Sequence, residues 1–184
     1  MDVRLGELRH HDRARVSELL VSTRAFSREE VAVALELFDE SFADRESAGA
    51  DDANVADADY EFIGAYDGDR LLGYACVGPT PATDGTFDLY WLAVDAAAQG
   101  KGIGRALVRE VERDLAERGG RLLLVETSSR PDYEKTRAFY ARCGYTESAR
   151  IKDFYAPADD RILLTTRLTS NSSHTTRERG ATTR

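Results

Sequence analysis

A short glycine-rich stretch, residues 99–106 with the sequence QGKGIGRA, holds the residue types that bind a phosphate. Gly100, Gly102 and Gly104 occupy alternate positions, and Arg105 follows directly. Glycine lets the backbone take unusual dihedral angles and lets a ligand approach the main chain closely. A helical pattern begins just after these glycines, and the first turn of a helix presents free N–H groups and the positive end of its dipole. The stretch therefore predicts an anion site, with a plain glycine-rich helix start as the alternative.

Three phosphate-binding patterns are candidates for this stretch. The P-loop pattern G-x-x-x-x-G-K-[ST] is absent from the sequence. The dinucleotide pattern G-x-G-x-x-G lacks its third glycine, because arginine or leucine stands in that place. Glu126 ends an apolar run and imitates the acidic residue that binds a ribose, so a dinucleotide-binding oxidoreductase stays open as an alternative. The third pattern, Q-x-x-G-x-G, is complete at Gln99, Gly102 and Gly104.

At this third pattern and around it, the sequence resembles the GNAT superfamily of acyl-CoA-dependent N-acetyltransferases, as a single-domain member of the bacterial or archaeal type. The run LYWLAV at residues 89–94 precedes the loop. Downstream, AFY at residues 138–140 is followed by CGY at residues 143–145, at the spacing of the family. The resemblance implies an α/β fold with a mixed, splayed sheet flanked by helices. It also implies acetyl-CoA as the acyl donor and co-substrate.

The resemblance further implies which residues bind the cofactor. The pyrophosphate is expected at the glycine-rich loop, and the pantetheine arm beside the end of the preceding strand, where it pairs with the backbone like an added strand. A bulge in that strand, and a splay between it and residues 122–126, are implied as well. The expected cofactor-binding residues are Leu92, Ala93, Val94, Gln99, Gly100, Lys101, Gly102, Ile103, Gly104 and Arg105.

Two residues are the candidates for catalysis of direct attack by an amine on the bound thioester in a ternary complex. Tyr140 matches the general acid of the family, which donates to the departing thiolate; a core aromatic on an apolar helix stripe is the alternative. Glu126 is the first candidate for the base because it ends the strand beside the splay, and a purely structural acid is its alternative. Asp88 on the neighbouring strand is the second candidate. A regulatory module that binds acyl-CoA without transferring the acyl group also stays open.

The expected acceptor is a small primary amine or an amino-acid-like compound, with a protein amine left open. Phe26 lies in a connection that often walls the acceptor pocket in the family, although it also fits a hydrophobic staple before a helix cap. Strict alternation along the strand 87–94 predicts that Asp88 and Tyr90 share one face and that Leu89 and Trp91 share the other. Asp153 could present an anion to the acceptor or form a turn. Tyr133 stands where many relatives carry an asparagine that contacts the cofactor.

These residues need a framework of strands and helices that brings them together. The run 87–94, the helical pattern after the loop, and the apolar run 122–125 predict a parallel strand pair joined by a right-handed crossover. A loop is expected over residues 42–59, and a linker over residues 153–160. The other expected strands cover residues 3–8, 61–66, 71–77, 145–151 and 161–168, and the other expected helices centre on residues 13–20, 28–38 and 136–143.

Length and composition set the broad class of the protein. The chain of 184 residues is 42% hydrophobic, which suits one domain over residues 1–168 followed by a disordered polar tail over residues 169–184. A net charge of −8 argues against nucleic acid or anionic membranes as partners. The two cysteines form no metal-binding or disulfide pattern. Without an apolar run of membrane-spanning length or a signal peptide, we expect a cytoplasmic protein, and the sequence leaves open whether it is a homodimer.

Overall fold

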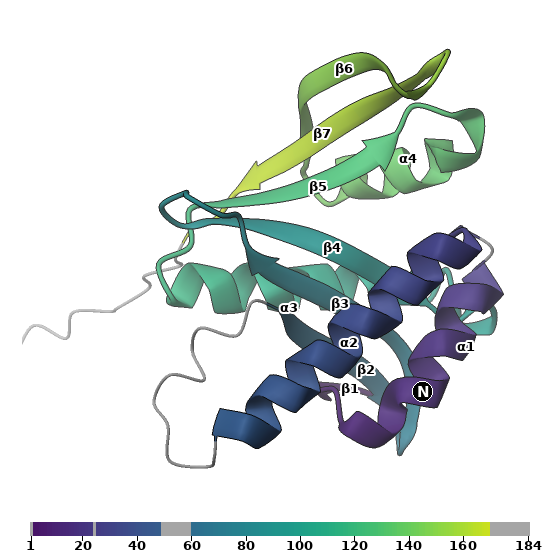
Figure 1. The fold of residues 1–184 in the computed structure, drawn as a ribbon, viewed down its shortest axis with the longest axis vertical. Coiled ribbons are helices and arrows are strands. Elements are labelled where there is room, and N and C mark those ends of the chain that lie inside the picture. The colour runs from purple at the N-terminus through teal and green to yellow at the C-terminus, as the bar shows by residue number, and fades with distance from the viewer. Residues whose placement is uncertain (1, 24, 49–59, 170–184) are drawn as a thin grey trace, which may run out of the picture.

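The computed structural model describes residues 2–23, 25–48 and 60–169. Seven strands form one mixed sheet in the order β1-β2-β3-β4-β5-β7-β6, with helices on both faces, so the expected fold class is confirmed (Figure 1). The strands are β1 (Val3–Glu7), β2 (Glu61–Asp67), β3 (Arg70–Pro79), β4 (Thr86–Val94), β5 (Leu122–Ser128), β6 (Thr146–Ala156) and β7 (Asp159–Arg167). The helices are α1 (Arg13–Thr23), α2 (Arg28–Ala48), α3 (Ile103–Glu117) and α4 (Glu134–Arg142).

Helix α2 is longer than the sequence pattern predicts. The prediction of a loop from residue 42 is wrong as far as Ala48, because the helix continues to that residue. The rings of Phe38 and Phe42 lie 4.6 Å apart, so the apolar stripe of the helix extends one turn further. The rest of the predicted loop, residues 49–59, and the predicted tail beyond residue 169 lie outside the described residues. None of the helices in the described part of the chain is long and apolar enough to cross a membrane.

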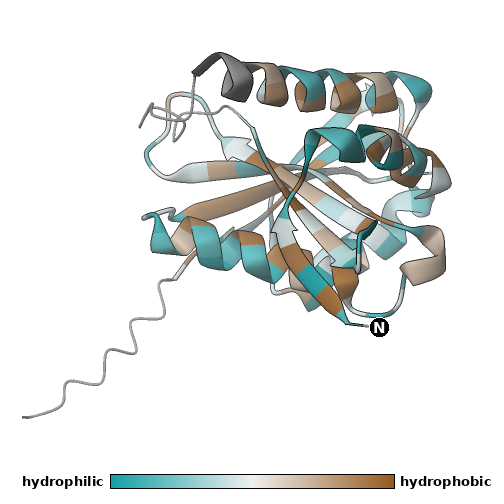
Figure 2. Ribbon diagram, turned by 90° about the horizontal axis from the view of Figure 1, so that it is seen from below, coloured by the Kyte–Doolittle hydropathy of each residue, from teal (hydrophilic) through white to brown (hydrophobic). Residues whose placement is uncertain are grey.

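Each face of the sheet is covered by its own hydrophobic core (Figure 2). On one face, α3 packs mainly against β3, β2 and β4, and its fully buried Leu107 and Leu115 share a core with Leu123 of β5 and Ile162 of β7. On the other face, α1 and α2 pack over the first strands of the sheet; the buried members of that core include Val16, Leu20, Phe38, Phe62 and Tyr74. The two cores thus attach helices to both faces of the sheet.

Strand β4 contains a bulge at Tyr90. In the antiparallel pairing with β3, Cys76 lies opposite Trp91, while the next residue, Val77, lies opposite Leu89. The extra residue reverses the alternation of side chains along β4. The prediction that Leu89 and Trp91 share a face is therefore wrong: Leu89 belongs to the core under α3, and Trp91 packs with the core under α1 and α2.

Strands β4 and β5 run parallel but pair over a short distance only. Their register joins Thr86 to Leu122, Phe87 to Leu123 and Asp88 to Leu124, and then ends. Strand β4 continues to Val94 and β5 to Ser128, so the two strands diverge beyond the paired segment (Figure 1). The divergence opens the middle of the sheet at the carboxyl ends of two parallel strands.

The last two strands complete the sheet beyond β5. Strand β7 pairs antiparallel with β5 on one side and with β6 on the other. Strand β6 reaches Ala156, which pairs with Asp159 of β7, so the predicted linker over residues 153–160 is wrong for most of its length. Asp153 has a positive φ of 53° and interrupts the β6 pairing before the tip of the hairpin.

Asp95 anchors the chain between β4 and the glycine-rich loop. Its carboxylate accepts a hydrogen bond of 2.9 Å from the backbone N–H of Ala97 and forms ion pairs with Arg15 of α1 and, at 3.2 Å, with Arg70 of β3. The N–H bond and the two arginines hold the pKa of Asp95 below its ordinary value. Asp95 thereby ties the start of the loop to both α1 and the neighbouring strand.

We predict that Asp95→Asn lowers the free energy of unfolding by about 1–3 kcal/mol at pH 7, since charge-assisted hydrogen bonds are lost in a mostly buried place. The folded-state pKa of Asp95 lies below the unfolded value, so its contribution is present above about pH 5 and is lost as the pH falls through the folded pKa. Urea unfolding at several pH values measures this, with the exposed Asp69→Asn as the control. A difference between Asp95→Asn and wild type that does not shrink in acid would contradict the assignment.

Candidate active site

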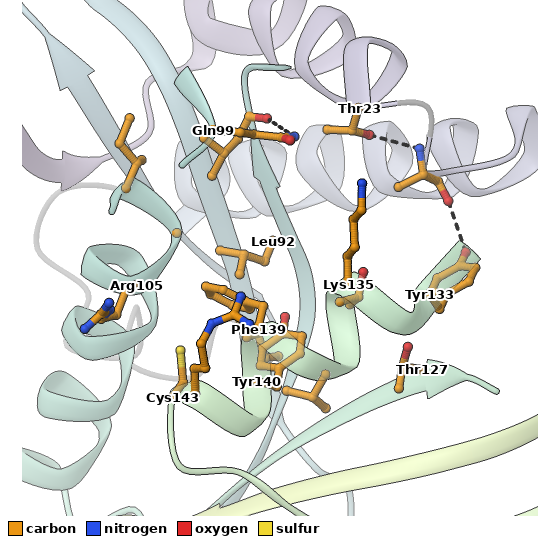
Figure 3. Close-up of a pocket in the computed structure, with 18 of the residues that line it drawn as sticks. Thr23, Leu92, Gln99, Arg105, Thr127, Tyr133, Lys135, Phe139, Tyr140 and Cys143 are labelled. Atoms are coloured by element: carbon orange, nitrogen blue, oxygen red, sulfur yellow. Dashed lines mark hydrogen bonds between the residues drawn. The ribbon is translucent and has the colours of Figure 1, made fainter. Parts of the chain in front are cut away.

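A pocket of about 610 Å³ fills the opening between β4 and β5. Residues from the α1–α2 connection, β4, the glycine-rich loop, β5 and α4 line it. Figure 3 shows Arg105 and Cys143 toward one end and Thr127 and Tyr133 toward the other. Of the residues singled out in the sequence, those that line the pocket are Phe26, Tyr90, Leu92, Val94, Gln99, Gly100, Gly102, Ile103, Gly104, Arg105, Glu126, Tyr133 and Tyr140.

The glycine-rich loop forms the first end of the pocket. Gly100 and Gly102 have positive φ angles of 76° and 85°, in the left-handed region that favours glycine. Gly102 caps the N-terminus of α3, and its carbonyl accepts the first bond of the helix, 3.0 Å from the N–H of Ala106. The amides of the first turn of an α-helix have no carbonyl of their own helix to bind. A Cβ built on Gly100 or Gly102 would meet no atom within 4 Å, so there is room for a ligand beside this backbone.

The side chains around this loop take different positions. The Nε2 of Gln99 donates a 3.2 Å hydrogen bond to the carbonyl of Val94, which links the loop to the end of β4. Arg105 lines the pocket from the first turn of α3, whereas the exposed Lys101 and the buried Ala93 do not. The loop therefore offers main-chain amides and the Arg105 guanidinium to an anion.

Tyr140 lies in the wall of the pocket on α4. The residue is 5% exposed, and its ring packs between those of Phe139 and Tyr145, at 5.0 Å and 5.3 Å. Burial raises the pKa of Tyr140 above its ordinary value, so the hydroxyl keeps its proton across the physiological range. Tyr140 is thus a hydrogen-bond donor and a weak acid, not a base.

Glu126 lies two residues beyond Leu124, the last residue of β5 that pairs with β4, at the point where these two strands have separated. One carboxylate oxygen accepts a hydrogen bond from the hydroxyl of Tyr155, and the other forms an ion pair with Arg161 of β7. Burial and the bond to Glu126 raise the pKa of Tyr155, so this hydroxyl remains a donor. The two partners orient the carboxylate, which still has lone pairs for a further donor.

The α1–α2 connection closes the far end of the pocket. Phe26 packs edge-on against Trp91 of β4, with ring centroids 5.3 Å apart, and also lines the pocket. It directly precedes the capping box in which the Ser27 hydroxyl accepts from the N–H of Glu30 at 3.1 Å and the Ser27 N–H donates to the Glu30 side chain at 2.7 Å. Both roles considered for Phe26, pocket wall and neighbour of the helix cap, are therefore compatible with its position.

Two acidic residues singled out in the sequence do not line the pocket. Asp88 accepts a hydrogen bond of 2.5 Å from the Thr80 hydroxyl. Asp153 lies in the β6–β7 hairpin, where its carboxylate accepts from the N–H of Ala158 at 2.6 Å. The structure thus gives Asp88 a partner next to its own strand and Asp153 a partner within the turn.

Several pocket residues were not singled out from the sequence. On α4, Lys135 and Thr136 line the pocket together with Phe139 and Cys143, at helical spacings of three and four, so the stripe that contains Tyr140 could have indicated them. Burial raises the pKa of the Cys143 thiol. Thr127 of β5 also lines the pocket and is 5% exposed, and its hydroxyl finds no hydrogen-bond partner among the residues that the structure describes. Whether a threonine hydroxyl has a hydrogen-bond partner cannot be predicted from the sequence.

Comparison with known proteins gives one consistent family. The model of the Acetyltransferase (GNAT) family matches residues 25–145. N-alpha-acetyltransferase RimI of Mycobacterium tuberculosis is 35% identical over 97 residues, which are 51% of this chain and 57% of that protein. The other curated relative is matched over 30% of its length, so the chain spans about half or less of the curated relatives that it matches.

Solved structures share the fold over nearly the whole chain. A crystal structure of a GNAT-family protein from Desulfovibrio desulfuricans has a TM-score of 0.83 and 40% identity, covering 91% of this chain and 100% of the other. The PaiA N-acetyltransferase from Thermoplasma acidophilum, solved with coenzyme A, has a TM-score of 0.66 and 16% identity, covering 91% and 99%. At this low identity, the second likeness concerns the fold alone.

We predict that Thr127→Val leaves the free energy of unfolding unchanged or raises it by up to about 1 kcal/mol, because an unpaired buried hydroxyl is replaced by a methyl group of the same size. Urea unfolding measures it. Thr165→Val on β7 is the control, since the Thr165 hydroxyl is 2.5 Å from that of Ser148, and it should lower the stability by about 0.5–1.5 kcal/mol. A clear loss of stability in Thr127→Val would mean that its hydroxyl has a structural partner.

Proposed function

The chain belongs to the Acetyltransferase (GNAT) family, and on this premise we propose that it transfers an acetyl group from acetyl-CoA to a primary amine. The observation that carries this proposal is the opening between β4 and β5, with the glycine-rich start of α3 at one end and Glu126 at the strand end beyond it. A parallel pair that separates at its carboxyl ends leaves room and backbone for an extended ligand. Tyr140 lines the same pocket.

The residues at the end of the pocket formed by the glycine-rich loop fit acetyl-CoA. The left-handed conformations of Gly100 and Gly102, the open space where their Cβ atoms would lie, and the free amides of the first turn of α3 suit a pyrophosphate. Arg105 adds a positive charge in the pocket lining. Leu92 and Val94 line the pocket from the segment of β4 that pairs with β3 but not with β5. We place the pantetheine arm beside this segment.

Tyr140 and Glu126 carry the proton transfers in this proposal. When bound, acetyl-CoA would supply a thioester carbonyl that a neutral amine can attack. Glu126 takes the proton of the attacking nitrogen through a water molecule, since its two oxygens are oriented by Tyr155 and Arg161. Tyr140, whose hydroxyl stays protonated, donates a hydrogen bond to the departing sulfur.

The acceptor enters at the far end of the pocket. The exposed carboxylate of Glu126 attracts an ammonium group there, and Phe26 and Tyr90 supply aromatic walls. A small primary amine or an amino-acid-like compound suits these groups. RimI of Mycobacterium tuberculosis is named as an N-alpha-acetyltransferase, so a peptide amine belongs in the test panel.

The proposal is tested by incubating the protein with acetyl-CoA and a panel of amines, amino-acid amides and short peptides. We expect release of free thiol that depends on the amine, with the acetylated amine identified by mass spectrometry. Thermal protection by coenzyme A without thiol release from any member would support a binding module instead. Protection by NAD(H) and not by coenzyme A would support an oxidoreductase.

We predict that Gly102→Val weakens coenzyme A binding about tenfold or more, because a β-branched residue disfavours the left-handed conformation and its side chain occupies the space beside the loop amides. Isothermal titration calorimetry measures the affinity. Gly119→Val is a matched control at the other end of α3: its φ is also 85° and its Cβ would also meet no atom within 4 Å. Equal affinity in both variants would exclude the loop as the pyrophosphate site.

We predict that Tyr140→Phe lowers kcat about 10²-fold or more, since a positioned proton donor is removed from the leaving group, while coenzyme A affinity stays within about twofold. Steady-state kinetics and calorimetry measure the two quantities. Tyr145→Phe is the control because it removes the hydroxyl of the neighbouring buried ring, which does not line the pocket. Full activity of Tyr140→Phe would leave Tyr140 with a packing role alone.

A further inference from the structure

One hydrogen bond spans the far end of the pocket between segments that are distant in the chain. The hydroxyl of Tyr133 donates to the backbone carbonyl of Ala25, with 3.0 Å between the oxygens. Tyr133 ends a short 3₁₀ turn (η4, Pro131–Tyr133) just before α4, whereas Ala25 lies in the α1–α2 connection. Both residues line the pocket, and Figure 3 shows the bond at the side opposite Arg105 and Cys143. The bond therefore joins the two walls of the pocket at the end away from the glycine-rich loop.

The η4 side of this bridge is held firmly in place. The guanidinium of Arg137 donates to the carbonyls of Ser128 and Arg130, at 2.6 Å and 2.9 Å. The N–H of Arg130 donates to the Ser128 hydroxyl at 3.0 Å, and the N–H of Tyr133 donates to the carbonyl of Arg130 at 3.1 Å. These bonds fix the backbone position of Tyr133, and therefore limit the positions that its hydroxyl can occupy.

The α1–α2 side is held by fewer and longer contacts. The N–H of Ala25 lies 3.3 Å from the Thr23 hydroxyl, and the Phe26 ring packs on Trp91 at 5.3 Å. Ala25 itself is exposed. The Tyr133 hydroxyl thus contributes a directed bond between η4 and the α1–α2 connection, in addition to the contact of Phe26 with Trp91.

The bridge lies over groups that suit an acceptor. Thr127, with its unpaired hydroxyl, lies on the same side of the pocket as Tyr133 (Figure 3). A rotation about the Cα–Cβ bond of threonine exchanges its hydroxyl and methyl positions and can turn the hydroxyl toward a ligand. Glu126, the preceding residue of β5, lines the same pocket. The position of the bridge therefore bears on which acceptors reach Glu126.

We propose that Tyr133 is a specificity-determining residue for the acceptor: its bond to Ala25 keeps the α1–α2 connection close to α4 and so favours amines with small substituents. The proposal rests on the amine acetyltransferase activity proposed above. The net free energy of one neutral hydrogen bond is modest. Its loss therefore corresponds to a change of about two- to tenfold in the preference for a large over a small amine.

The test compares two acceptor probes, glycinamide and phenylalaninamide, in wild type and Tyr133→Phe. This change keeps the ring and removes only the hydroxyl. We expect kcat/KM for phenylalaninamide relative to glycinamide to rise about two- to tenfold in the variant, with coenzyme A affinity unchanged. A second readout needs no activity: backbone amides in residues 25–30 should exchange hydrogen faster in Tyr133→Phe than in wild type.

The matched control is Tyr66→Phe, which removes a tyrosine hydroxyl that donates to Asp12 at 2.7 Å outside the pocket. It should change neither the acceptor ratio nor the exchange of residues 25–30. An unchanged acceptor ratio in Tyr133→Phe would overturn the proposal, as would unchanged exchange in these residues. Absence of transfer to every amine of the panel above, by wild type that still binds coenzyme A, would instead refute the proposed activity, and this inference with it.

Discussion

The separation of β4 from β5 is the constraint on which the rest of the structure depends. Parallel neighbours normally pair along their length, and here pairing ends after Asp88 and Leu124. The bulge at Tyr90 lies just beyond the last pair, where an extra residue bends the strand. Because each strand remains anchored on its other side, β4 to β3 and β5 to β7, the sheet opens locally without losing its outer hydrogen bonds.

Two kinds of polar group line this opening, and they come from different elements of the fold. Main-chain amides and Arg105 gather at the start of α3, so that end attracts anions. The carboxylate of Glu126 lies at the other side, where Arg161 and Tyr155 orient it without covering it. The protonated hydroxyl of Tyr140 lines the same pocket on α4. A ligand that is anionic at one end and reacts with an amine at the other suits this distribution.

Much of the fold could be predicted from the sequence, because the strands and helices carry strong apolar periodicity. The glycine-rich loop could be placed before α3 because it lies between an apolar strand pattern and an apolar helix pattern. The resemblance predicted a bulge in β4, and the structure confirms it, but its position at Tyr90 could not be predicted from the residues, since strict alternation along β4 reads equally well without it. The position of Asp153 in a turn, and the reach of Tyr133 to Ala25, depend on contacts between distant segments. A pattern within one element carries no information about such contacts.

The position of β7 within the sheet has a consequence for how the protein is made. Strand β7 is the last to leave the ribosome, yet it lies between β5 and β6, both of which precede it. Until it arrives, the outer edge of β5 has no neighbour, and unpaired strand edges are prone to join other chains. Arg161 also belongs to β7, so the Glu126 carboxylate acquires this partner only after β7 has emerged. The nascent chain can thus complete its glycine-rich loop well before the Glu126 carboxylate is oriented by Arg161.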